Sequence, residues 1–212
     1  GIHLLDLKPN FGYRTLFEVN GLPSIEMKYH FPSLSGSPTL DKIKRQEMAT
    51  LLKADHIVCP STVTAAYVAS LGVSPDKIPV IPNGIEPELF APKSLPRSEP
   101  PVILYVGTLA LWQGLEVLLE ALPLILERKP AQLWIVGKGR KDRQKTLLKM
   151  VRKNGLEPYV SLREAYSHHT IPELINQAAV CVAPLIFNDR NVTQGCCPIK
   201  ILEYAACARP IV

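Results

Sequence analysis

Long hydrophobic runs are scarce in this sequence. The longest nearly uncharged apolar stretch, residues 178–187, is far shorter than the roughly 20 residues that a membrane-spanning helix needs. No charged segment followed by an apolar one opens the chain, so we expect no secretory signal peptide. With 47% hydrophobic and 20% charged residues, the chain is apolar enough to bury a core. These features predict a globular, cytoplasmic protein.

Cysteines at metal-ligand spacing are also lacking. The chain has five cysteines, an odd number, and no two of them form the C-x-x-C pair of common zinc sites. We therefore expect neither a metal site nor a disulfide framework. The cysteines are Cys59, Cys181, Cys196, Cys197 and Cys207.

Aromatic residues are missing from the most basic segment, residues 138–153. Two interpretations stay open for its charges: a solvated helix face, or a surface attracted to anionic lipid head groups at the inner face of a membrane. Because no aromatic side chains interleave with the charges, we expect no nucleic-acid partner. Only Asp142 offsets the basic residues, which are Lys138, Arg140, Lys141, Arg143, Lys145, Lys149, Arg152 and Lys153.

What the sequence does contain is a steady alternation of short β-rich runs and helical patterns. This alternation is typical of βαβ units around a parallel sheet, so the expected fold class is α/β. Residues 21–38 are expected to form a polar loop marked by proline. We expect strands at 14–20, 56–59, 78–81, 102–106, 132–136, 159–162 and 180–183, and helices at 40–52, 61–71, 115–127, 141–153, 171–177 and 199–207.

A proline-rich segment divides the chain. Residues 86–101 show little periodicity and hold several of the 20 prolines, so we predict an interdomain linker there. The domains on either side are residues 1–85 and 102–212. Because the chain opens without methionine and stops inside an expected strand, we expect it to be part of a longer protein.

Glycines follow two of the expected strands. In open parallel sheets ligands bind beyond the carboxyl ends of the strands. Gly107 ends the strand at 102–106 and Gly114 precedes a helix, a setting that fits a phosphate site but also any strand-to-helix turn. Gly137 and Gly139 lack the spacing of a dinucleotide fingerprint or a P-loop, so we interpret them as turn glycines.

A third loop, residues 184–198, carries more polar groups. It ends at Pro198, near the start of a helix, where a missing N–H costs nothing. Lys200 and Glu203 follow on one helical face. One interpretation is an exposed lysine–glutamate pair. In the other, the amides of residues 195–197 hold a diphosphate and Glu203 accepts hydrogen bonds from ribose hydroxyls.

Several blocks of the chain, in order, resemble the retaining glycosyltransferases of family 4. That family's nucleotide-sugar signature resembles PIKILEYAACARPIV at the end of the chain. The resemblance implies a GT-B-like fold of two Rossmann-like domains, with the N-terminal one truncated and the C-terminal donor domain nearly complete. Its other segments resemble FEVNGLPSIEMKY, KADHIVCPSTVTAAYVASLGVSPDKIPVIPNGIEPELFAP, VILYVGTLALWQGLEVLLEAL and YVSLREAYSHHTIPELINQAAVCVAPL.

The resemblance also implies an activity. A hexosyltransferase of this family moves a sugar from a nucleoside-diphosphate sugar to an acceptor hydroxyl with retention, in polysaccharide, glycolipid or glycoconjugate synthesis. It needs no cofactor and no metal, and its acceptor is a glycan or a lipid-linked molecule. A binding-only or inactive nucleotide-sugar domain and a nucleotide-sugar epimerase of the same fold are the alternatives. No catalytic residue can be named.

Two departures from the family pattern concern the diphosphate. The first acid of the family's E-x7-E pair falls on Gly195, so only the second, Glu203, carries over. The usual Arg and Lys after the first donor-domain strand fall on Thr108 and Gln113, and Lys200, the loop amides, Lys138 or Arg190 would have to compensate. The expected donor-binding residues are Gly107, Thr108, Gln113, Lys138, Gly195, Cys196, Cys197, Lys200 and Glu203.

The adjacent His168 and His169 have no partner at ligand spacing. We interpret them as a loop or helix-start feature and not as a catalytic base.

Overall fold

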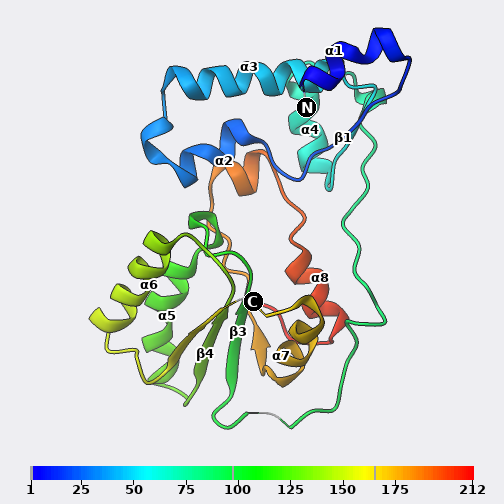
Figure 1. Ribbon diagram of the computed structural model, residues 1–212. Coiled ribbons are helices and arrows are strands. Elements are labelled where there is room, and N and C mark those ends of the chain that lie inside the picture. Colours follow the sequence, from blue (N-terminus) through cyan, green and yellow to red (C-terminus); the bar gives the residue numbers. More distant parts are fainter. Residues whose placement is uncertain (1, 97, 165) are drawn as a thin grey trace. The chain divides into compact units, whose positions relative to one another are not determined.

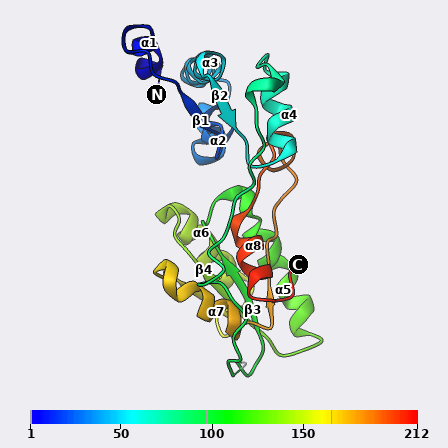
Figure 2. The ribbon, with the colours of Figure 1, turned by 90° about the vertical axis from the view of Figure 1, so that its right-hand side faces the viewer.

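The computed structural model describes residues 2–212 apart from 97 and 165. Their contacts divide the chain into two compact units (Figures 1 and 2). Unit 1 is the N-terminal part of the chain up to Asn83, together with Phe187–Cys197. Unit 2 comprises Gly84–Ile186 and Pro198–Val212. The proline-rich segment therefore belongs to unit 2, and a stretch of the predicted donor domain belongs to unit 1.

Unit 1 contains a small parallel sheet in which β1 pairs with β2. Unit 1 also has short helical turns at Pro32–Leu34, Pro75–Lys77 and Asp189–Thr193. Its helices and strands are α1 (Ile2–Phe11), β1 (Leu16–Glu18), α2 (Pro23–His30), α3 (Pro38–Lys53), β2 (His56–Val58) and α4 (Thr62–Ser70). Its buried core includes Val19, Leu22, Leu51, Ile57, Cys59, Val68 and Val73.

Serine side chains begin two of these helices. The Ser37 hydroxyl accepts a hydrogen bond from the Leu40 N–H at 3.2 Å, and Ser61, the expected N-cap, accepts one from the Thr64 N–H at 3.1 Å. Each satisfies a backbone donor that the first turn would leave without a partner. The local sequence thus fixes where α3 and α4 begin.

The prediction of an unbroken loop at 21–38 is wrong, because α2 lies within it. Pro23 occupies the start of α2, where proline fits the helix, and Glu26 in the first turn favours the positive end of the helix dipole. The strand predicted at 78–81 is also wrong and is reduced to a single bridge between Val80 and Cys59.

Unit 2 is a parallel α/β sheet with the strand order β5-β4-β3-β6, which confirms the predicted fold class. A further bridge joins Cys181 to Ile211. Its elements are β3 (Val102–Val106), α5 (Leu115–Leu126), β4 (Gln132–Val136), α6 (Lys141–Lys153), β5 (Val160–Arg163), α7 (Ile171–Gln177), β6 (Val180–Cys181) and α8 (Ile199–Ala206), with helical turns at Leu111–Gln113 and His168–Thr170.

Side chains of β3 and β4 alternate between two cores. Tyr105 and Ile135 pack with α5 and α6, whereas Leu104 and Val136 pack with α7 and α8. Helices therefore cover both faces of the sheet, with α5 and α6 on one side and α7 and α8 on the other (Figure 1). This burial on both faces explains why β3 reads as a continuous apolar run.

The strand order places a topological switch point at β3. The chain passes from β3 to β4 on one side and later returns to β6 on the other. Ligands of open parallel sheets bind in the crevice beyond the carboxyl ends of the strands at such a point. A ligand is therefore expected to bind next to the residues that follow Val106.

Within the described residues, no helix combines the length and apolar composition needed to cross a bilayer.

Candidate functional site

Two glycines let the ends of β3 and β4 approach each other. The Gly107 N–H donates to the Val136 carbonyl oxygen at 2.9 Å. Gly137 has a φ of 156°, and a Cβ there would lie 1.8 Å from the Gly107 carbonyl oxygen. Since no side chain fits this contact, Gly137 is required for packing.

A lysine from α8 lies at the end of β3. A Cβ on Gly107 would be 2.8 Å from the Lys200 Nζ. Lys200 is only 9% exposed, donates to the Gln113 Oε1 at 2.5 Å, and has its Nζ 4.2 Å from the centre of the Tyr105 ring. The fold therefore keeps an ammonium group at the switch point, where a cation–π contact and an amide oxygen orient it.

Two buried tyrosines hold the strand end in place. The Tyr105 hydroxyl donates to the Thr108 carbonyl oxygen at 2.6 Å, and the Tyr204 hydroxyl accepts from the Val106 N–H at 2.8 Å. Burial raises the pKa of both phenols, which therefore stay protonated. The position of Lys200 is thus supported by fixed neighbours.

Helix α8 begins at the same place. Pro198 occupies its N-cap position, and among the described residues no side-chain hydrogen bond caps the helix. Backbone N–H groups of a first turn and the helix dipole favour an anion. Lys200 lies in that first turn, so α8 contributes both an ammonium group and a favourable helix end.

Glu203 lies three residues beyond Lys200 on α8. Burial raises the pKa of its carboxyl group, while His168 and Lys200 act in the opposite direction. Glu203 lines a pocket of about 370 Å³ within unit 2. The other lining residues are Gly84, Ile85, Glu86, Phe90, His168 and Ile199.

His168 is held in this pocket by residues distant in sequence. Its Nε2 is 3.2 Å from the Glu86 Oε1, and its ring centre is 5.1 Å from that of Phe90. As expected, it lies in the turn before α7. Its place beside Glu203 was not predicted, because no local pattern links it to Glu86.

The predicted diphosphate amides at residues 195–197 belong to unit 1. Gly195 has a φ of 78°, and a Cβ there would lie 2.8 Å from the Val63 Cγ1. The Asn83 Nδ2 donates to the Cys197 carbonyl oxygen at 2.6 Å. Contacts inside unit 1 thus account for the glycine and for one carbonyl group of this segment.

Neighbouring charges on that segment are bound to α2. The Arg190 Nε donates to the Glu26 Oε1 at 3.1 Å, and Asp189 accepts hydrogen bonds from Lys28 and Tyr29. Burial, helped by Asp189, raises the pKa of Tyr29 to about 12. Arg190, expected as a compensating cation, is therefore engaged by a carboxylate of unit 1.

Of the predicted residues in unit 2, the structure brings Gly107, Gln113 and Lys200 into contact. Thr108 and Lys138 are exposed beyond the strand ends. Tyr105 was not predicted as a support for Lys200, although an aromatic residue two positions before a strand-end glycine was visible in the sequence. Among the described residues, no three or more His, Cys, Asp or Glu side chains come together as a metal site would require.

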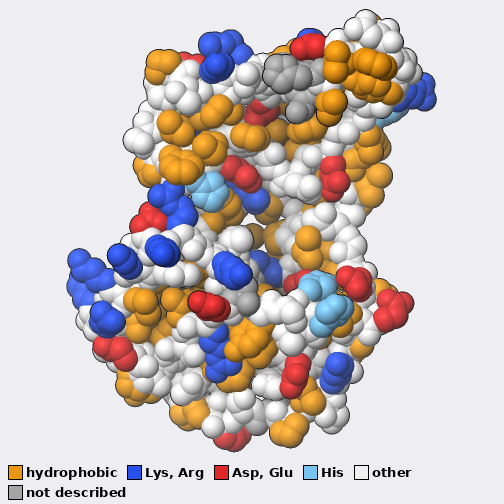
Figure 3. Space-filling model, viewed as in Figure 1, with side chains coloured by type: hydrophobic (Ala, Val, Ile, Leu, Met, Phe, Trp, Pro, Cys, Tyr) orange, Lys and Arg blue, Asp and Glu red, His pale blue; other side chains and the backbone are white. Residues whose placement is uncertain are grey.

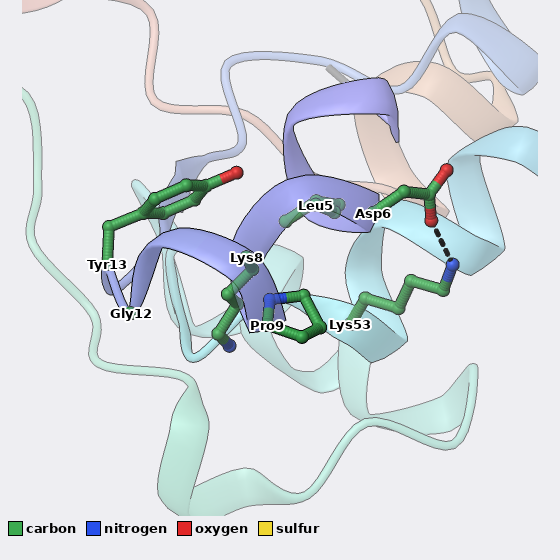
Figure 4. Close-up of a pocket in the computed structure, with 7 residues that line it drawn as sticks. All are labelled: Leu5, Asp6, Lys8, Pro9, Gly12, Tyr13 and Lys53. Carbon is green, nitrogen blue, oxygen red and sulfur yellow. Dashed lines mark hydrogen bonds and ion pairs between the residues drawn. The ribbon is translucent and has the colours of Figure 1, made fainter.

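Unit 1 has a separate pocket of about 600 Å³ between α1 and α3 (Figure 4). Two of its lysines are already paired: Lys53 with Asp6 at 2.6 Å and Lys8 with Asp55 at 2.5 Å. We assign no ligand to this pocket.

Two family models match the chain. The model of Glycosyl transferases group 1 matches residues 100–212, and that of Glycosyltransferase Family 4 matches residues 4–89. The first covers more than half of the chain.

Curated relatives and a solved structure agree with these matches. A phosphatidylinositol N-acetylglucosaminyltransferase subunit of Arabidopsis thaliana is 28% identical over 92% of this chain, and the subunit of the same name in Homo sapiens is 25% identical over 85%. The chain spans 40% and 36% of the length of these relatives. HepE of Anabaena, solved with UDP and glucose, matches 99% of this chain and 55% of its own with a TM-score of 0.76 at 17% identity. The chain therefore belongs to the group 1 glycosyltransferases and has the GT-B fold.

Proposed function

We propose that this chain binds the nucleotide sugar of a retaining, metal-independent glycosyltransferase, and that the donor is a UDP-sugar. The observation that carries the proposal is the buried Lys200 ammonium group beside Gly107, at the switch point of the sheet. HepE, which shares the fold, was solved with UDP. The names of both relatives suggest N-acetylglucosamine as the first sugar to test.

In this proposal Lys200 and the first turn of α8 bind the diphosphate. Charge-assisted hydrogen bonds are worth about 1.5–3 kcal/mol each, roughly twice a neutral one. The same groups would stabilise the negative charge that grows on the leaving diphosphate during transfer. Since Tyr105 and Gln113 already orient Lys200, little reorganisation is needed when the donor binds.

Glu203 would bind the ribose. Its carboxylate accepts hydrogen bonds, and the pocket around it provides apolar walls from Phe90 and Ile199. A ribose offers two neighbouring hydroxyl donors that suit a single carboxylate. Diphosphate and ribose groups would then follow one another along α8.

Gln113 stands where the family pattern has a cation. Its Oε1 accepts from Lys200, so it can orient the ammonium group but adds no positive charge. We expect weaker donor binding than a site with further cations would give.

The acceptor and the activity of the whole protein are part of the proposal. Both relatives are named for phosphatidylinositol, which favours a lipid-linked acceptor over a free glycan. A binding-only domain and an epimerase are distinguished from a transferase by product analysis with UDP-N-acetylglucosamine. A transferase that lacks its acceptor slowly releases UDP, a binding-only domain releases none, and an epimerase yields a second nucleotide sugar.

The first test is calorimetric titration of UDP, GDP and ADP into the chain, with and without EDTA. We expect saturable binding of UDP that EDTA leaves unchanged. Glu203→Gln should weaken it roughly 10-fold or more through the loss of a charged acceptor. Glu120→Gln, which neutralises an exposed glutamate on α5, is the matched control and should bind like the wild type. Absence of nucleotide binding by a folded chain would contradict the proposal.

A further inference from the structure

Helix α6 turns a row of cations toward solvent. Leu147 and Val151 are buried in the core, so the opposite side of the helix faces water. Figure 3 shows Lys and Arg side chains gathered over this helix. We call this side the basic face of α6; its exposed residues are Lys141, Asp142, Lys145, Thr146, Leu148, Lys149, Arg152 and Lys153.

The order of these charges disfavours the helix itself. Lys141, Lys145, Lys149 and Lys153 are spaced four residues apart, and like charges at this spacing repel. Lys141 also lies at the positive end of the helix dipole, where a cation is unfavourable. Packing within unit 2 therefore gives no reason for this arrangement, whereas an external anionic surface would offset the repulsion.

Nearby carboxylates are engaged by other residues. Asp142 pairs with Arg140 at 3.1 Å, and Glu116 pairs with Arg143 at 2.6 Å. Among the ion pairs of the described residues, none involves a lysine or arginine of the basic face. The positive charge of this face is thus not cancelled within the protein.

We propose that the basic face of α6 docks on an anionic phospholipid surface. Leu148, at the edge of the face nearest the buried side of the helix, is 39% exposed, and such a mixture of cations with an apolar residue suits the interface of a bilayer. Nucleic acid is a poorer fit, because the face has no aromatic side chain on which a base would stack. Docking would hold the protein at the membrane where a lipid-linked acceptor resides, although the contact itself needs no catalysis.

The test is co-sedimentation of the protein with phosphatidylcholine vesicles, with and without phosphatidylserine. We expect binding only with phosphatidylserine and a decrease as salt is raised. Each lysine near an anionic bilayer contributes roughly five-fold to partitioning, so the triple variant Lys141→Gln, Lys145→Gln, Lys149→Gln should bind on the order of 100-fold more weakly. Arginine at the same three positions should preserve binding.

A matched control removes three cations elsewhere. Lys42, Lys44 and Arg45 are exposed on α3, and changing all three to Gln alters the net charge by the same amount. We expect this control to bind vesicles nearly as well as the wild type. An equal loss in the control would overturn the proposal in favour of non-specific attraction, and so would retention of binding by the α6 triple variant or a preference for RNA over vesicles.

Two further measurements keep the result interpretable. Circular dichroism should show that the α6 triple variant is folded, with a thermal midpoint no lower than that of the wild type, since the like-charge repulsion is removed. Its titration with UDP should be unchanged. Failure of UDP to bind the wild type would refute the proposed function while leaving the vesicle result valid.

Discussion

Two segments of this chain carry similar sequence signals but have different surroundings. Both the end of β3 and residues 187–197 combine a glycine with polar side chains, and a cation lies near each glycine, Lys200 of α8 at β3 and Arg190 within residues 187–197. At β3 the glycine lies beside a buried ammonium group that the Tyr105 ring and the Gln113 amide help to orient. In residues 187–197 the glycine packs on Val63, and Arg190 is bound to Glu26.

The difference shows what a glycine-bearing loop needs before it becomes a candidate ligand site. A backbone that can approach a ligand is common to both segments. A charge whose position is fixed at a strand end of an open sheet is found, among these two, only at β3. Contacts between residues far apart in sequence decide whether such a loop is a candidate ligand site or is packed within its own unit.

The largest expected effect tests the charge at β3. Lys200→Met keeps the apolar stem of the side chain but removes the ammonium group, so UDP affinity should fall roughly 10- to 150-fold through the loss of a charge-assisted hydrogen bond. Titration calorimetry on the folded variant measures this, with Lys129→Met, an exposed lysine after α5, as the control. Unchanged affinity would show that the two segments do not differ in the way proposed.

A smaller effect is expected for the glycine of the other segment. Gly195→Ala places a Cβ 2.8 Å from the Val63 Cγ1 at a φ of 78°, so unit 1 should lose about 1–3 kcal/mol of stability. UDP affinity should stay within two-fold or so, since the groups proposed to bind UDP lie in unit 2. Chemical denaturation and calorimetry on one preparation give both values. A strong loss of UDP binding in a stable Gly195→Ala protein would show that residues 187–197 contribute to the donor site after all.

The smallest effect concerns pH. Burial raises the pKa of Glu203 above its ordinary 4.5, so the carboxyl group takes up its proton earlier during acidification. UDP affinity should therefore fall as pH decreases through a midpoint above 4.5. The free energy of unfolding depends on pH in the opposite direction to UDP affinity. The contribution of Glu203 to it decreases as pH rises from 4.5 through the raised pKa, because the folded form binds more protons than the unfolded form in that window. UDP itself titrates, so the readout is the difference between wild type and Glu203→Gln, and parallel pH curves would refute the assignment.

Much of unit 2 was predictable because its elements have clear periodicity. The strands at 102–106 and 132–136 and the helices at 141–153 and 171–177 have the predicted bounds. The two strands are short apolar runs that each end at a glycine, and the helix at 141–153 is an amphipathic run that ends at Asn154-Gly155. Local sequence is sufficient where burial on both faces of the sheet fixes the pattern.

Unit 1 was less predictable, because a proline in the sequence is compatible both with a loop and with the start of a helix. Pro23 and Pro38 each begin a helix, yet in sequence they look like the loop prolines around them. The candidate site was only half visible for a different reason. Lys200 meets Gln113 across 87 positions, and His168 meets Glu86 across 82, so only tertiary structure reveals these pairs.

The chain enters unit 1 twice, and this has a consequence for how such proteins recombine. A donor unit exchanged between relatives at the proline-rich segment would bring its own version of Phe187–Cys197 into a foreign unit 1. Arg190 and Asp189 would then face an α2 that had not been selected with them. Successful chimaeras are therefore expected to keep residues 187–197 from the same parent as α2, which requires three junctions in the gene where a simple fusion has one.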